Sequence, residues 1–224
     1  FFVVIVPPVV RVVDPVAGRT LELLELGESE AALSCATVSF AGRGGEVFVA
    51  VGTARSLTFH PRSHEGCYVH VYRLLESRLV LLHRTEVDDV PLGLAEFRGR
   101  LLVAVGATLR MYDLGKRKLL RKTEAAVAPT LITKVEVVGD RIFVADAAMS
   151  VHLARYVRDR NRLAVFADDP VGRCVTAFAP LDYDTVAVAD KFGNVAVLRL
   201  GPECSDDVDD AAGDAWDHGR NGGA

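Results

Sequence analysis

The chain has 224 residues, of which 50% are apolar and 25% charged, a composition that argues against disorder over most of its length. The net charge is −4, and the charged residues are unevenly distributed along the chain. Residues 201–224 hold seven of the 30 acids and one of the 26 basic residues, so residues 1–200 carry 23 acids and 25 bases. A nearly neutral body argues against a dedicated binder of nucleic-acid backbones, which needs many uncompensated cations.

The first ten residues form the longest apolar run, interrupted by Pro7 and Pro8. This run is too short to cross a bilayer, and no secretory signal pattern surrounds it, so we expect no membrane association. We treat residues 1–8 as a start segment outside the repeat described next, and expect the chain to belong to a longer polypeptide. The four cysteines lack a Cys-x-x-Cys pair, which is typical of a reduced intracellular protein.

Short apolar segments bounded by Gly, Asp and Pro follow one another along the chain, and two of them recur. One recurring strand ends in a turn residue, at 47–52, 101–106, 142–146 and 186–190. Its partner strand follows, at 69–74, 109–114, 151–156 and 195–200. The partner strands begin 40, 42 and 44 residues apart, the length of a four-stranded propeller blade.

The elements within one unit can be assigned in order. We expect a partial first unit around Arg11–Asp14, a hairpin turn at Gly42–Gly45, and an inserted loop at Ala54–Gly66. A tight turn at Gly106-Ala107 precedes a turn at Asp113–Gly115, and further strands cover 118–122 and 131–137. The sequence therefore predicts an all-β, WD-repeat-like β-propeller fragment over residues 9–202, with four to five four-stranded blades of a larger, seven-bladed ring. Residues 203–224 are predicted to be an acidic, Gly-rich flexible loop or tail.

Residues that could support catalysis are present but lack the spacing that catalysis needs. His60, His64 and Cys67 are spaced like metal ligands, yet no fourth ligand is evident. Asp182 and Asp184 fit turn capping better than cation binding, and no Gly-x-Ser-x-Gly elbow is present. We therefore expect no enzyme activity, metal, cofactor or small-molecule substrate.

The strongest charge cluster is a basic hairpin with five cations: Lys116, Arg117, Lys118, Arg121 and Lys122. It could contact phosphate or an acidic protein face, or be a solvated hairpin on an outer blade strand. A second basic segment is weakened by the interleaved Asp159; its cations are Arg155, Arg158, Arg160 and Arg162.

Several segments together resemble a known family of large propeller proteins: Val12–Leu21, Ser29–Ser34, Leu109–Lys122, Phe166–Asp169 and Leu181–Asn194. The family includes the propeller subunit of splicing factor 3b, the damaged-DNA-binding adaptor and the largest cleavage-and-polyadenylation subunit. Residues 166–169 and 189–194 resemble the splicing subunit more closely than its relatives. The resemblance covers residues 9–224 and implies the opening blades of the third of three propellers.

The resemblance implies a nuclear, non-enzymatic scaffold in pre-mRNA splicing that holds a helical-repeat subunit and small accessory proteins of the splicing factor 3b complex. Phe192, beside Lys191, is our candidate partner contact, with packing between blades as the alternative. Two other functions stay open. One is a nucleic-acid contact through the basic hairpin, and the other is an adaptor role in ubiquitin ligation or polyadenylation.

Overall fold

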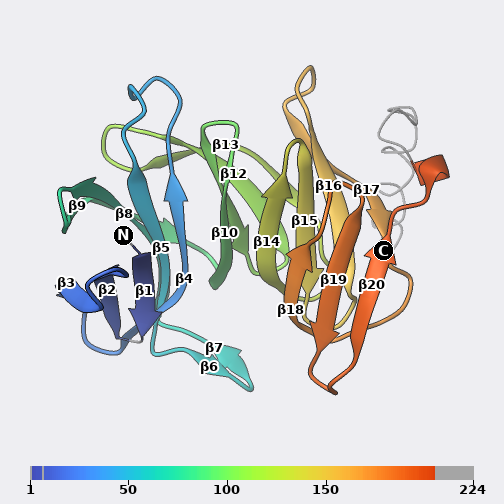
Figure 1. Cartoon of the computed structure of the whole chain (residues 1–224), viewed down its shortest axis with the longest axis horizontal. Helices are drawn as coiled ribbons and strands as arrows, with labels where there is room; N and C mark the ends of the chain where they lie inside the picture. Colours follow the sequence, from blue (N-terminus) through green and yellow to red (C-terminus); the bar gives the residue numbers. More distant parts are fainter. Residues whose placement is uncertain (1, 7, 205–224) are drawn as a thin grey trace, which may run out of the picture.

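The computed structural model describes residues 2–6 and 8–204, and Figure 1 shows that they fold into a row of small antiparallel sheets. Sheet 1 is three-stranded and sheet 2 four-stranded, with a short hairpin inserted in sheet 2. Their strands are β1 (Phe2–Val6), β2 (Val9–Asp14), β3 (Arg19–Glu25), β4 (Glu30–Val38), β5 (Phe48–Arg55), the hairpin β6 (Thr58–Phe59) and β7 (Arg62–Ser63), β8 (Gly66–Leu75) and β9 (Arg78–Val87).

Sheets 3 and 4 are four-stranded, and sheet 5 has three described strands. Their strands are β10 (Pro91–Phe97), β11 (Arg100–Val105), β12 (Thr108–Leu114), β13 (Leu119–Ala126), β14 (Ile132–Val138), β15 (Arg141–Asp146), β16 (Val151–Val157), β17 (Arg162–Asp168), β18 (Val175–Pro180), β19 (Thr185–Asp190) and β20 (Val195–Arg199). A 3₁₀ turn covers Pro202–Cys204, at the end of the described residues. The sheets confirm the predicted all-β propeller fragment, and no described helix is long and apolar enough to cross a membrane.

Strand pairing shows that the sheets are copies of one unit. In sheets 2–5 a β-bulge interrupts the pairing of the first two strands, for example between Pro91 and Gly93. In sheets 2–4 a second bulge interrupts the pairing of the last two strands, as between Met111 and Tyr112. Sheet 1 has this second bulge in its β2–β3 pairing, so β1–β3 correspond to the second, third and fourth strands of a unit.

The sheets pack face to face around a common side, because the first strands of sheets 2–5 contact one another in turn. Within β11, Leu101 and Val103 pack toward sheet 2, whereas Leu102 and Ala104 pack toward sheet 4. A strand buried on both faces needs apolar side chains at successive positions, which explains the continuous apolar runs in the sequence. Four such clusters fill the spaces between the five sheets.

The insertion within a blade predicted for Ala54–Gly66 is present, but it is shorter than predicted and contains a hairpin. β5 continues through Arg55 and β8 begins at Gly66, and the residues between them contain the hairpin β6–β7, which projects below the sheets in Figure 1. Its strands are two residues long and show no periodicity, so no pattern in the sequence could reveal them. The acidic segment from residue 205 onward lies outside the described residues.

Candidate interaction surfaces

The basic hairpin begins at the tight turn between β12 and β13. Gly115 is required there, because a Cβ at this position would lie 2.2 Å from the Lys118 carbonyl oxygen. The turn exposes Lys116, Arg117 and Lys118, and β13 then exposes Arg121 and Lys122. The structure therefore brings the five predicted cations onto one outer hairpin.

Their charges are not equally available. Arg121 forms an ion pair with Glu124 at 2.8 Å, and Lys122 pairs with Asp113 at 3.2 Å. Lys116, Arg117 and Lys118 have no carboxylate partner within residues 2–6 and 8–204. Among the described residues, three of the five cations therefore lack a carboxylate partner, a distinction that the sequence did not reveal. Arg121 and Lys122 share their carboxylates with Arg110 and Arg100, so their charges are only partly compensated.

Phe192 projects from the turn between β19 and β20. The Asp190 carboxylate accepts hydrogen bonds from the backbone N–H groups of Phe192 (2.8 Å) and Asn194 (3.0 Å) and from the Asn194 side-chain amide (2.8 Å). These hydrogen bonds lower the pKa of Asp190, and the bond from the Asn194 side chain contributes most. Phe192 is 72% exposed, with Lys191 Nζ 5.1 Å from the centroid of its ring, so it does not pack between the sheets that the structure describes.

The seven predicted contact residues do not form one surface. Successive strands of a sheet run in opposite directions, so turns between second and third strands lie at one end of the sheets and turns between third and fourth strands at the other. We call the end with the turns between second and third strands the middle-hairpin face, and the end with the turns between third and fourth strands the outer-hairpin face. Figure 1 shows the β19–β20 turn and the β6–β7 hairpin at one end and the β16–β17 turn at the other. Lys191 and Phe192 therefore lie on the middle-hairpin face, and the basic hairpin on the outer-hairpin face.

A buried polar cluster that sequence reasoning missed joins three strands of sheet 2. Glu30 Oε1 accepts hydrogen bonds from Thr53 Oγ1 at 2.5 Å and from His70 Nε2 at 2.8 Å, and these residues are 4%, 0% and 6% exposed. Burial lowers the pKa of His70 although Glu30 opposes the shift, so the imidazole is neutral near pH 7. The Tyr72 hydroxyl lies 3.3 Å from His70 Nδ1 and completes a network whose polar groups satisfy one another.

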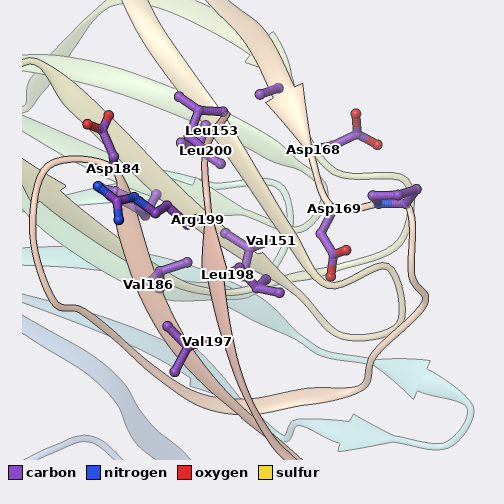
Figure 2. A pocket seen from close by; sticks show the side chains of 13 residues that line it. Val151, Leu153, Asp168, Asp169, Asp184, Val186, Val197, Leu198, Arg199 and Leu200 are labelled. Atoms are coloured by element: carbon purple, nitrogen blue, oxygen red, sulfur yellow. The ribbon is translucent and has the colours of Figure 1, made fainter. Parts of the chain in front are cut away.

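Figure 2 shows a cavity of about 290 Å³ between sheets 4 and 5. Its apolar lining includes Phe143, Leu153 and Leu198, and Asp168, Asp169, Asp184 and Arg199 surround these side chains. In sheets 3 and 4 the corresponding space holds a leucine from the start of the fourth strand, Leu119 or Leu163, packed against the preceding sheet. Sheet 5 has three described strands and therefore no described fourth strand to supply such a leucine. This explains the cavity, which does not indicate a small-molecule site.

The other candidate sites from the sequence have structural roles or stay apart. Asp182 accepts a hydrogen bond from the Asp184 N–H at 2.8 Å, which confirms turn capping. His64 Nε2 lies 4.0 Å from Asp89 Oδ1. Burial of the Cys67 thiol raises its pKa to about 11, and the negative charges of Asp89 and Asp88 contribute to this rise. Within the described part of the chain, no three His, Cys, Asp or Glu side chains are grouped so that they could hold a metal ion.

Comparison of the sequence with known proteins shows which family the chain belongs to. The chain is 47% identical over 220 residues to Splicing factor 3B subunit 3 of Danio rerio, covering 96% of this chain and 18% of that protein. It is 48% identical to Pre-mRNA-splicing factor RSE1 of Mycosarcoma maydis, covering 90% of this chain and 17% of that protein. It is 43% identical to Spliceosome-associated protein 130 A of Arabidopsis thaliana, covering 96% of this chain and 18% of that protein.

The chain thus spans less than a fifth of the length of these relatives. The resemblance to the propeller subunit of splicing factor 3b is confirmed. Because the family model described as the CPSF A subunit region matches residues 9–214, nearly the whole chain, this protein belongs to the CPSF A subunit family.

Proposed function

We propose that this chain is part of a non-enzymatic scaffold in pre-mRNA splicing that acts in the nucleus. The observation that carries the proposal is the 47% identity, over 96% of the chain, to a protein named as a splicing factor 3B subunit. Identity at this level over a repeat fold preserves the packing between sheets and the turns that connect them. The partners we propose are the helical-repeat and small accessory subunits of the splicing factor 3b complex.

The geometry supports a scaffold because the sheets hold their turns in fixed positions. Apolar clusters fill the spaces between consecutive sheets, and the turns lie at the two opposite ends of the sheets (Figure 1). At these turns the side chains of Lys116, Arg117, Lys118 and Phe192 are exposed. A scaffold needs this separation of a packed interior from variable turns. Phe192, an exposed aromatic side chain on a hydrogen-bonded turn, is our proposed partner contact.

The second candidate function is direct RNA contact through the basic hairpin. Three exposed cations that have no ion pair among the described residues support it: Lys116, Arg117 and Lys118. Three cations give a weak and salt-sensitive attraction to phosphate, well below that of a dedicated RNA-binding module. An adaptor role in ubiquitin ligation or polyadenylation differs from the scaffold proposal in the partner bound.

Co-purification separates these functions. The full-length polypeptide that carries this chain is tagged and compared with a Phe192→Ser variant and with a variant that combines Lys116→Gln, Arg117→Gln and Lys118→Gln. Leu181→Ser, a change at another exposed apolar side chain, is the matched control. Bound helical-repeat splicing subunit and bound RNA are measured at low and high salt.

A splicing scaffold is expected to retain the helical-repeat subunit at high salt and to lose part of it in the Phe192→Ser variant alone. Salt-sensitive RNA capture that is lost in the triple Gln variant, without a protein partner, would instead support the RNA contact. Retention of ubiquitin-ligase or polyadenylation subunits in place of splicing subunits would contradict the splicing proposal.

A further inference from the structure

The outer edge of β9 is open in this fold. β9 is the fourth strand of sheet 2 and pairs with β8 on one side, and no described strand pairs with its other edge. Figure 1 places β9 at the outside of the row of sheets. The Leu79 N–H at the start of β9 donates a hydrogen bond to the Glu22 carboxylate. The remaining N–H and C=O groups on the outer edge have no partner strand among the described residues and could pair with another extended chain.

Three consecutive apolar side chains are exposed on this edge strand. Val80, Leu81 and Leu82 are 48%, 52% and 41% exposed. The pairing registers of the two sheets match these positions to Leu120, Arg121 and Lys122 of β13, two of which are charged. Natural edge strands discourage pairing with other chains by exposing charges or by forming bulges. β9 has a bulge at Leu82, but its apolar triplet carries none of the charges that β13 exposes at the matching positions.

Cations surround the triplet. Arg78 and Arg84 are exposed at either side of it, and Arg84 lies 4.2 Å over the Tyr68 ring. The basic hairpin adjoins the same strand, because the Leu119 N–H donates a hydrogen bond of 2.9 Å to Thr85 Oγ1. Within the described residues no carboxylate pairs with any of five cations around this edge: Arg78, Arg84, Lys116, Arg117 and Lys118.

His83 adds a polar group that lacks a partner. It lies between Leu82 and Arg84, is 8% exposed, and neither of its ring nitrogens has a hydrogen-bond partner in the part of the chain that the structure describes. An unsatisfied buried imidazole is unfavourable, and because both ring nitrogens are shielded from solvent, only a local rearrangement of β9 would bring them to a partner.

We propose that the outer edge of β9 binds an extended, acidic segment of a partner protein, which adds to sheet 2 as a further β-strand. Backbone pairing would use the open edge, apolar side chains of the segment would cover Val80, Leu81 and Leu82, and its carboxylates would face the surrounding cations. RNA fits this surface less well, because its exposed apolar side chains are aliphatic and the nearby Tyr68 ring is covered by the Arg84 guanidinium. This surface is separate from the Phe192 turn on the middle-hairpin face.

The test uses the full chain and a fluorescent peptide in which Glu alternates with Val. A peptide in which Lys alternates with Val and a short oligouridine serve as competing probes. Anisotropy gives the affinities, and hydrogen exchange reports protection of the β9 backbone amides. The variants are Leu81→Thr, which introduces a polar, β-branched residue that suits a strand, and a combined Lys116→Gln and Lys118→Gln change, with Leu181→Thr as the matched control at another exposed leucine.

The acidic peptide is expected to bind and to slow exchange in β9, and the lysine peptide is expected not to bind. Leu81→Thr should weaken binding about tenfold through lost apolar contact, whereas Leu181→Thr should leave it unchanged. The Gln variant should weaken binding and reduce its dependence on salt. Failure of the acidic peptide to bind would overturn the proposal, as would preferential oligouridine binding that Leu81→Thr leaves unchanged.

Discussion

Replacing Glu30 with alanine is expected to lower the free energy of unfolding by about 2 kcal/mol or more. The change removes the acceptor of two buried hydrogen bonds, from Thr53 Oγ1 and from His70 Nε2. Each orphaned buried donor costs about 1–3 kcal/mol. Removing a buried carboxylate also removes its own desolvation cost, which offsets part of this loss.

Glu30→Gln is the informative companion variant, because it keeps an acceptor oxygen and the side-chain volume. We expect it to change the free energy of unfolding by about 1 kcal/mol or less, since both donors can still find a partner. Glu86→Ala on β9 is the surface control, with an expected effect within about 0.5 kcal/mol.

Urea unfolding followed by circular dichroism gives the three free energies, provided that the slope against urea concentration stays constant. Hydrogen exchange then locates the effect, which should be largest for the amides of β5 and β8. The reasoning would be refuted if Glu30→Ala were as stable as Glu86→Ala, or if the Gln and Ala variants lost equal stability.

Two further predictions follow from burial. Burial lowers the pKa values of His70, His83 and His152 in the folded chain. In the unfolded chain these histidines return to the ordinary pKa of about 6.5, so near and below that pH the unfolded chain binds more protons than the folded chain. Urea midpoints should therefore fall as pH drops from about 7.5 to about 5.5, and a rise would contradict the assignment. Leu119→Ala should cost about 3 kcal/mol of unfolding free energy because Leu119 packs against sheet 2. The neighbouring, half-exposed Leu120→Ala should cost under about 1 kcal/mol, and equal thermal shifts for the two variants would contradict the packing.

The repeat could be predicted from the sequence because its signals are local. Apolar runs and turn residues such as Gly106-Ala107 determine where strands begin and end, and the spacing of the partner strands gave the blade length. The hairpin β6–β7 was missed because its strands are too short to carry a period. The exposure of Phe192 was left open because a lone aromatic residue in a turn fits either an exposed or a packed position.

The candidate surfaces depend on contacts between residues that are distant in the sequence. Arg121 and Lys122 belong to the cluster of five cations in the sequence, yet in the structure Arg121 pairs with Glu124 and Lys122 pairs with Asp113. Both carboxylates are shared, because Glu124 also pairs with Arg110 and Asp113 also pairs with Arg100. These pairings depend on strand register across β12 and β13, which residue types alone do not specify.

The sequence by itself determined that this chain is a repeat of short strands joined by tight turns, because local polarity and turn chemistry decide those features. Only the tertiary structure decided which turns share a face, which cations keep their charge available and which strand edge is open. The same packing joined Glu30, Thr53 and His70 across three strands. These properties arise from the pairing and stacking of sheets, which bring together side chains that the linear pattern leaves apart.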